Sequence, residues 1–274
     1  MQDSRIALVT GGGRGLGRVM SLALLAAGHR VILSSTDAGS MAEVVAESGA
    51  AADRTAVIVA DLTVPGEAEK LADATLSQFG RVDILVNNAG LGVNSLRPDF
   101  LQRPFRFWEA DRPAMERFFA VNAVAPMVLA ARLAPAMAAR GWGRIVCNTT
   151  SLDTMLRFTL YGGSKAALEA ETAIMASDLA GTGVTANVLV PGGGTGTRMT
   201  DELGMPRDQL IPAEAMAAPM VFLASKASDG FTGRRILANR WQIALPPAEA
   251  ASRASDPIAW TGIGTAAVNP AIAR

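Results

Sequence analysis

Residues 6–17, IALVTGGGRGLG, decide the fold of this chain of 274 residues. Four apolar residues typical of a buried strand lead into a glycine-rich turn, and the spaced apolar residues of a helix follow over residues 16–27. Glycines let the backbone turn tightly and approach a pyrophosphate, while the N-terminus of the helix offers unpaired N–H groups and a partial positive charge. The stretch therefore predicts the opening of a dinucleotide-binding α/β domain. No Lys-Ser or Lys-Thr pair follows the last glycine, which disfavours an ATP-binding P-loop.

The same alternation of short apolar runs and longer helical patterns continues along the chain. Strands are expected at residues 6–9, 31–33, 57–59, 84–86, 145–147, 184–190 and 235–237, and crossover helices at residues 16–27, 41–48 and 67–79, among others. Such alternation indicates an α/β fold with a doubly wound parallel sheet of about seven strands and helices on both faces.

One domain is expected over residues 1–240, since no repeat or low-complexity linker divides it. An irregular insertion rich in Pro, Arg and aromatic residues is expected at about residues 91–112. Residues 241–274 form a tail extension, where Pro and Gly argue against long regular elements.

Composition narrows the class of partner. The 25 basic and 25 acidic residues give a formal net charge of zero, so no global basic field draws the chain to nucleic acid or anionic lipid, and small molecules are the expected partners. The single Cys147 excludes an internal disulfide and a cysteine-based metal cluster, and no metal site is expected. The single His29, at the starting edge of a strand, is expected in a surface turn, away from any ligand at the carboxyl edge.

The pattern favours a soluble, cytoplasmic protein. Only five residues precede the first strand, which leaves no room for a signal peptide. The most membrane-like stretch, residues 120–139, is interrupted by Asn122, Pro126, Arg132 and Pro135, and is therefore expected to form a buried helix rather than a membrane span.

Tyr161 and Lys165 are four residues apart, and therefore lie on one face of a helix. An ammonium held near a phenolic oxygen favours the phenolate and lowers a tyrosine pKa that is otherwise about 10. The pair therefore predicts a tyrosine that exchanges protons near neutral pH.

Three motifs together carry a family resemblance. Thr10-Gly-x-x-x-Gly15-x-Gly17, then Asn87-Asn88-Ala89-Gly90, then Tyr161-x-x-x-Lys165 resemble the short-chain dehydrogenase/reductase family in order and spacing, over roughly residues 4–237. The resemblance implies a Rossmann-type fold, a nicotinamide cofactor, and hydride transfer between that cofactor and a secondary alcohol or ketone.

The resemblance also assigns catalytic roles. Tyr161 becomes the general acid or base, Lys165 holds the ribose hydroxyls and lowers the pKa of the phenol, and Asn122 anchors a water that leads from Lys165 towards bulk solvent. A buried helix asparagine is the plainer interpretation of Asn122. The hydroxyl that polarises the substrate is less regular: counting places Thr150 in the family's serine position, whereas residue type favours Ser151, and we expect Ser151.

The cofactor contacts follow from the same resemblance. They are Thr10, Gly11, Arg14, Gly15, Leu16 and Gly17 in the first turn, Ser35 after the second strand, Asp61 and Leu62 after the third, Asn88, Ala89 and Gly90 after the fourth, Tyr161 and Lys165, and Pro191, Gly192 and Thr197 after the sixth. The alternative for Asp61 is a helix N-cap.

The second strand bears on the choice of cofactor. Ser35 stands where family members that prefer NAD usually carry Asp, and Arg14 can pair a 2′-phosphate, so NADP(H) is expected over NAD(H). Asp37 lies slightly downstream and could restore a preference for NAD.

Substrate and assembly are less determined. The aromatic residues of the insertion and tail are expected either around an apolar substrate pocket, or at an oligomer interface or in the core of the insertion. They are Phe100, Phe105, Phe107, Trp108, Trp241 and Trp260. Arg97, Arg103 or Arg106 could address an acidic group there.

The resemblance suggests a homodimer or homotetramer. Two other functions stay open: a catalytically idle dinucleotide sensor or interaction protein, and a lyase, dehydratase or epimerase on the same scaffold.

Overall fold

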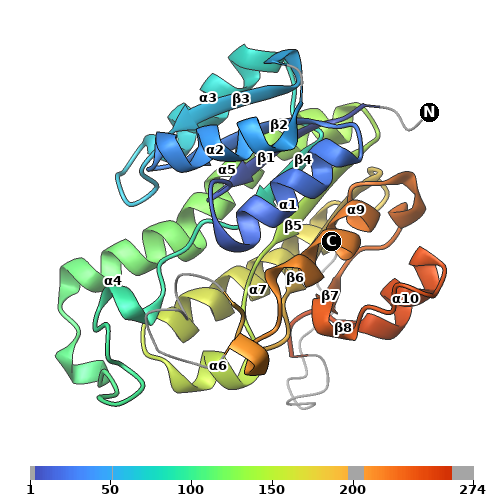
Figure 1. The fold of residues 1–274 in the computed structure, drawn as a ribbon. Helices are drawn as coiled ribbons and strands as arrows, with labels where there is room; N and C mark the ends of the chain where they lie inside the picture. Colours follow the sequence, from blue (N-terminus) through green and yellow to red (C-terminus); the bar gives the residue numbers. More distant parts are fainter. Residues whose placement is uncertain (1–3, 51, 197–206, 261–274) are drawn as a thin grey trace, which may run out of the picture.

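The computed structural model describes residues 4–50, 52–196 and 207–260 as one α/β unit (Figure 1). The strands are β1 (Ile6–Thr10), β2 (Arg30–Ser35), β3 (Thr55–Val59), β4 (Ile84–Asn87), β5 (Gly143–Cys147), β6 (Val184–Val190), β7 (Arg234–Leu237) and β8 (Ser255–Pro257). The helices are α1 (Gly15–Ala26), α2 (Ala38–Ser48), α3 (Glu67–Phe79), α4 (Arg112–Phe119), α5 (Ala125–Ala139), α6 (Leu152–Arg157), α7 (Tyr161–Asp178), α9 (Ala217–Leu223) and α10 (Pro247–Ala254).

The strands form one sheet in the order β3-β2-β1-β4-β5-β6-β7-β8. All neighbours are parallel except β7 and β8, which run antiparallel. The order reverses direction between β1 and β4. In sheets of this kind ligands bind beyond the carboxyl ends of the strands at such a switch point. The fold predicted from the sequence is therefore confirmed, with one strand more than expected.

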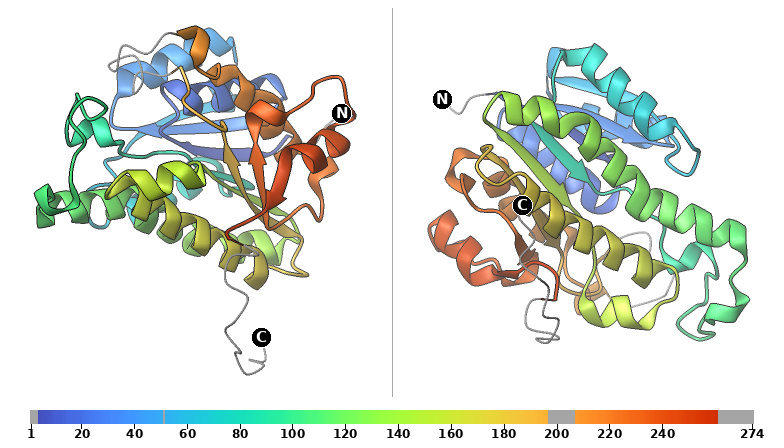
Figure 2. Two further views of the ribbon diagram at one scale, coloured as in Figure 1. Left: turned by 90° about the horizontal axis from the view of Figure 1, so that it is seen from below. Right: turned by 180° about the vertical axis from the view of Figure 1, so that it is seen from behind.

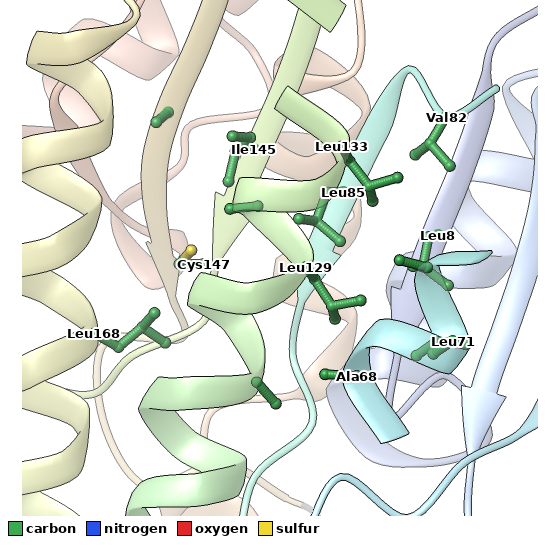
Figure 3. Close-up of a cluster of buried hydrophobic side chains, with 14 of the residues drawn as sticks. Leu8, Ala68, Leu71, Val82, Leu85, Leu129, Leu133, Ile145, Cys147 and Leu168 are labelled. Atoms are coloured by element: carbon green, nitrogen blue, oxygen red, sulfur yellow. The ribbon is translucent and has the colours of Figure 1, made fainter. Parts of the chain in front are cut away.

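The sheet lies between two helical layers because successive strand residues point to opposite faces (Figure 2). Leu8, Leu85 and Ile145 point towards α3, α5 and α7 in one buried cluster, which Figure 3 shows in close-up. Ala7 and Val86 point towards α1, α2, α9 and α10 in the other. Because both faces are covered, the central strands are fully buried, as their continuous apolar sequences require.

The extra strand comes from the region expected to be an irregular tail. α10 and β8 fold back along β7, where Arg234 of β7 donates to the Ser255 carbonyl at 3.0 Å. Pro246 and Pro247 do not prevent this helix, because a proline at the first helical position lacks only an N–H group that would be unpaired anyway. The tail therefore contains a short helix and a short strand, but no long regular element within its described residues. Residues 261–274 lie outside the described part of the chain.

One helical run has a membrane-like composition. Residues 112–139, which comprise α4, a π-helical turn (Ala120–Val124) and α5, are long and apolar enough to cross a membrane. Half of the apolar window is buried within the protein, where Leu129, Leu133 and Met137 pack in the core. This is the packing expected of a core helix.

Candidate active site

The glycine-rich turn joins β1 to α1 in a conformation that glycine favours. Gly11 and Gly15 have φ values of 64° and 53°, in the left-handed region. A Cβ on Gly17 would lie 2.0 Å from the Gly11 carbonyl oxygen, so no side chain fits where the turn meets the helix. Arg14 precedes α1 in an extended conformation and makes no side-chain cap to the helix. The close approach of backbone and helix end fits the diphosphate of a dinucleotide.

Polar contacts hold this turn against the end of β4. The Thr10 hydroxyl donates to the Val86 carbonyl at 3.2 Å and accepts from the N–H groups of Asn88 and Ala89, each at 3.0 Å. The Asn88 amide donates to the carbonyls of Thr10 and Gly11 at 2.9 and 3.2 Å. Thr10 and Asn88 therefore fix the two strands that border the switch point.

At the ends of β2 and β3 lie the residues assigned to the adenosine half of the cofactor. Asp37 caps α2, since its carboxylate accepts from the Ser40 N–H at 3.2 Å. The Ser35 hydroxyl accepts from the Asp37 N–H at 3.3 Å. Asp61 closes a turn with the N–H and hydroxyl of Thr63, at 2.9 and 2.7 Å. Helix α3 is preceded instead by Gly66, so the alternative of Asp61 as a helix N-cap is wrong.

Tyr161 begins α7, and the residue before it has an unusual backbone. Leu160 has φ 58° and ψ −54°, and the Tyr161 N–H donates to the Thr159 carbonyl at 2.6 Å across it. This geometry is that of a γ-turn with positive φ, which is rare and strained for a residue with a Cβ. The turn sets the direction in which the chain enters α7, and with it the position of Tyr161.

Lys165 and Asn122 meet beside Gly90. A Cβ on Gly90 would lie 2.9 Å from Asn122 Oδ1 and 3.2 Å from Lys165 Nζ, so a larger residue would require the Asn122 side chain to shift and would crowd the Lys165 ammonium. Lys165 Nζ donates to the Asn148 carbonyl at 2.8 Å and is almost completely buried. Burial lowers the pKa of Lys165 to about 8 because the charged form loses its hydration.

Asn122 lies in the π-helical turn between α4 and α5 and is fully buried. Its side chain accepts from the Leu91 N–H at 2.9 Å and donates to the Leu91 carbonyl at 3.1 Å and to Ser164 Oγ at 2.9 Å. Ser164 Oγ in turn donates to the Tyr161 carbonyl at 2.9 Å. π-turns often occur at functional sites. Here the turn ties the end of β4 to the helix that carries Tyr161 and Lys165.

The two candidate hydroxyls have different surroundings. The Ser151 hydroxyl caps α6: it accepts from the Thr154 N–H at 3.2 Å and lies 2.7 Å from the Thr154 hydroxyl. The Thr150 side chain instead lies close enough to Tyr161 to lower the pKa of its phenol by hydrogen bonding. Because the Ser151 hydroxyl is used in this cap, Thr150 is favoured as the partner of Tyr161, whereas residue type favoured Ser151.

The expected lowering of the tyrosine pKa by Lys165 is absent from the structure. The pKa of Tyr161 lies above its ordinary value because burial disfavours the phenolate, and the hydrogen bond with Thr150 offsets this only in part. The Lys165 ammonium is directed to the Asn148 carbonyl rather than to the phenol. Desolvation, which the sequence does not reveal, outweighs the helical spacing of the pair.

The loop after β6 starts with Pro191 and Gly192. The Pro191 carbonyl accepts from the Asn239 N–H at 3.0 Å, and Gly192 has φ 101°. A Cβ on Gly192 would lie 2.0 Å from Asn239 Oδ1. Thr197 lies outside the described residues.

The insertion contains no sheet strand and is held by its own side chains. Arg97 forms an ion pair with Glu109 at 2.8 Å and lies over the Phe105 ring at 5.1 Å, so it braces the insertion. Phe100 is buried and packs edge-on against Phe158, with ring centroids 5.3 Å apart, which brings the insertion to the loop before Tyr161.

The other aromatic residues separate into two groups. Phe107 and Trp108 pack against each other, and their exposed fractions are 70% and 69%. Trp241 packs on Phe222 at 5.7 Å against the α9 side of the core. Trp241 is partly buried and packs against the core.

His29 is buried, and its expected place in a surface turn is wrong. Its Nδ1 accepts from the Arg5 N–H at 3.3 Å, while burial and the nearby Arg5 and Arg54 lower its pKa. It lies next to β2 at the amino edge of the sheet, away from Tyr161. Within residues 4–50, 52–196 and 207–260, no three His, Cys, Asp or Glu side chains gather as a metal site would require.

Sequence reasoning missed four residues that contact this site: Asn148, Ser164, Glu169 and Arg235. Helical spacing could have found two of them, because Ser164 and Glu169 lie three and eight residues after Tyr161. Asn148 acts through its backbone carbonyl, which carries no sequence signal. Arg235 comes from a strand some 70 residues further along the chain.

Comparison with known proteins agrees with this geometry. A family model described as short chain dehydrogenase matches residues 5–208. A short-chain type dehydrogenase/reductase of Picea abies is 31% identical over 259 residues, covering 87% of this chain and 92% of that protein. A 3-oxoacyl-(acyl-carrier-protein) reductase of Synechocystis is 32% identical over 235 residues, covering 81% and 90%.

Solved structures show the same fold. The crystal structure of a metagenomic short-chain oxidoreductase in complex with NADP is similar with a TM-score of 0.70 and 25% identity, covering 85% of this chain and 95% of that one. A short chain dehydrogenase/reductase family protein reaches a TM-score of 0.71 at 30% identity. Together with the Tyr161, Lys165 and glycine-turn geometry, these matches show that the chain belongs to the short-chain dehydrogenase/reductase family, whose oxidoreductases bind a nicotinamide cofactor.

Proposed function

We propose that the chain is an NADP(H)-dependent oxidoreductase that interconverts a secondary alcohol and a ketone. One observation supports this most strongly: Tyr161, which lies close to Thr150, starts the helix whose Lys165 meets Asn122 beside Gly90. These groups gather just beyond the carboxyl ends of β4 and β5, where a doubly wound sheet binds its ligands.

Each residue then has a chemical role. When bound, the nicotinamide cofactor supplies or accepts the hydride. Tyr161 donates a proton to the carbonyl oxygen in reduction and removes it from the alcohol in oxidation. Thr150 donates a hydrogen bond to the same oxygen, and this bond strengthens as negative charge develops there. Lys165 holds the ribose hydroxyls. Asn122 holds the segment after β4 against α7 through its bonds to Leu91 and Ser164.

The preference for NADP(H) is supported by charge at the end of β2. Ser35 leaves this position uncharged, Asp37 is engaged in capping α2, and Arg14 is exposed beside the glycine turn. We expect Arg14→Ala to weaken NADPH binding far more than NADH binding, because only NADPH offers a 2′-phosphate to the guanidinium. Fluorescence titration with both cofactors measures this; equal losses would contradict the assignment.

A homodimer or homotetramer is part of the proposal. Met115, Phe119, Val124 and Ile174 expose between 39% and 51% of their surface along α4, the π-turn and α7. Exposed apolar side chains on these helices suit a subunit contact. Light scattering that finds only monomer would refute the assembly.

The decisive experiment combines cofactor titration with turnover of a ketone panel, comparing the wild-type protein with Tyr161→Phe. The proposal expects NADPH oxidation with ketone reduction by wild type, and its loss in Tyr161→Phe with cofactor binding retained. Product formation without net change in reduced nicotinamide would indicate a lyase or epimerase. Cofactor binding without turnover of any substrate would favour an idle sensor.

A further inference from the structure

A buried ion pair contacts the backbone of Thr150. Glu169 of α7 and Arg235 of β7 pair with side chains only 3% and 12% exposed. Arg235 Nη1 donates to Glu169 Oε2 and, at 3.4 Å, to the Thr149 hydroxyl. The Thr149 hydroxyl donates to Glu169 Oε2 at 2.8 Å, and Arg235 Nη2 donates to the Thr150 carbonyl.

These contacts join the two segments that bear the catalytic groups. Thr149 and Thr150 belong to the loop that leaves β5, and Glu169 lies one helical turn beyond Lys165 on α7. Arg235 reaches them from β7, two strands away from β5 in the sheet. The guanidinium therefore holds the Thr150 backbone at a fixed place relative to the helix that starts with Tyr161.

Stability alone does not account for the pair. Desolvation of two charges can exceed their mutual attraction, and apolar residues of similar size often stabilise a fold as well or better. What an apolar pair cannot supply is the set of directed bonds to Thr149 and Thr150. A guanidinium provides them through two nitrogens in one rigid plane, whereas a lysine ammonium is a single point charge.

We propose that Arg235, oriented by Glu169, is a positioning residue that holds Thr150 close to Tyr161. The expected effect on catalysis rests on the proposed function, in which Thr150 polarises the substrate oxygen. The contact between Thr150 and Tyr161 is independent of any substrate.

The sequence provides a direct probe of this contact, because Tyr161 is the only tyrosine in the chain. Protein labelled with meta-fluorotyrosine therefore gives one fluorine resonance, whose position reports hydrogen bonding at the phenol. Thr150→Val removes the partner hydroxyl and sets the reference position. Arg235→Lys keeps a positive charge near Glu169 but loses the hydrogen bond that Arg235 Nη2 donates to the Thr150 carbonyl.

Arg234→Lys is the matched control. Arg234 is the preceding residue of the same strand, but its guanidinium bonds Ser255 of β8, away from Thr150. We expect Arg235→Lys to move the fluorine resonance towards the Thr150→Val position and Arg234→Lys to leave it unchanged. Arg235→Lys added to Thr150→Val should cause no further shift, because both act through the same contact.

Catalysis gives a second readout. Arg235→Lys should lower kcat by roughly tenfold to a hundredfold, the range expected for a misplaced catalytic group, with the KM for NADPH unchanged. Should Arg235→Lys fail to fold by circular dichroism, the double variant Glu169→Met with Arg235→Met removes both charges together and takes its place in the same measurements.

Either folded variant would overturn the inference if its fluorine resonance and kcat remained at the wild-type values while only thermal stability changed. A wild-type protein that reduces no ketone would refute the proposed function instead. The fluorine comparison would still decide whether Arg235 positions Thr150.

Discussion

Thr150 and Ser151 are adjacent hydroxyl residues that the fold uses differently. Ser151 satisfies the first turn of α6, while Thr150 contacts Tyr161. Residue type alone favoured serine because a primary hydroxyl crowds a substrate less. The deciding factor is instead where α6 begins, since the residue at the N-cap directs its hydroxyl to the helix.

Separate substitutions distinguish the two roles. Thr150→Val removes the hydroxyl with little change in shape, and should lower kcat by a factor on the order of 10² or more, as loss of an oxyanion donor does. Ser151→Ala should cost about 1 kcal/mol of stability through the lost cap and change kcat little. Steady-state kinetics and urea unfolding measure both quantities. A larger kcat loss in Ser151→Ala would return the role to Ser151.

Individual residues also show where sequence reasoning ends. Tyr161, Lys165, Asn122 and Gly90 were predicted from motifs. The structure places Asn122 and Lys165 beside Gly90 and links Asn122 through Ser164 to the Tyr161 carbonyl. Their electrostatics could not be predicted, because desolvation depends on packing from elements distant in sequence. The raised pKa of Tyr161 is of this kind.

At the scale of elements, the junction of α6 and α7 shapes the site. Gly162 lies against the last turns of α6, and a Cβ there would lie 2.0 Å from the Met155 carbonyl oxygen. Gly163, the next residue, is exposed, and its Cβ would meet nothing closer than Phe119 Cζ at 3.8 Å. Of the two glycines between Tyr161 and Lys165, only Gly162 therefore has no room for a side chain.

The adjacent pair makes a matched test of this packing. Gly162→Ala should destabilise the protein by about 1–3 kcal/mol, because α6 must move, and should lower kcat by displacing Thr150 from Tyr161. Gly163→Ala should leave kcat unchanged and stabilise the protein by up to about 1 kcal/mol through helix propensity. Thermal unfolding and kinetics of both variants check this. Equal tolerance of alanine at both positions would contradict the close approach of α6 to α7.

The elements were predicted well where periodicity was strong and poorly where it was short. All seven expected strands are present, because buried parallel strands are continuous apolar runs. β8 was missed, since Ser255–Pro257 has no apolar pattern and is recruited by the free edge of β7. The γ-turn at Leu160 was also missed, because leucine gives no sequence signal for a positive φ.

At the scale of the whole molecule, burial of Lys165 in the site lowers the free energy of unfolding at neutral pH. Its pKa in the folded protein is about 8, against an ordinary value of 10.5. Below pH 8 the ammonium is charged in both states, but only in the unfolded chain is it fully hydrated. The folded protein therefore bears a desolvation cost at neutral pH, as is common for groups that functional sites bury.

This cost predicts how stability depends on pH. Between about pH 8 and 10.5 the unfolded chain binds more protons at Lys165 than the folded protein does, so the free energy of unfolding should rise with pH. At about 1.4 kcal/mol per pH unit, the full interval corresponds to roughly 3 kcal/mol. Tyr161 and Cys147, whose pKa values burial raises, act in the opposite direction at the alkaline end.

The rise should therefore be clearest between about pH 8 and 9, before Tyr161 ionises in the unfolded chain and while ionisation of the Cys147 thiol offsets only part of it. Lys165→Met has no such charge, so it should be more stable than wild type at pH 7 by roughly 3 kcal/mol and show no rise over this interval. Urea unfolding of both proteins at a series of pH values measures the difference. A wild-type stability that stays level or falls from pH 8 to 9, parallel to Lys165→Met, would mean that Lys165 keeps its ordinary pKa. The lysine would then hold the ribose as a fully hydrated cation, and the site would be more open to water than the packing around Gly90 and Asn148 implies.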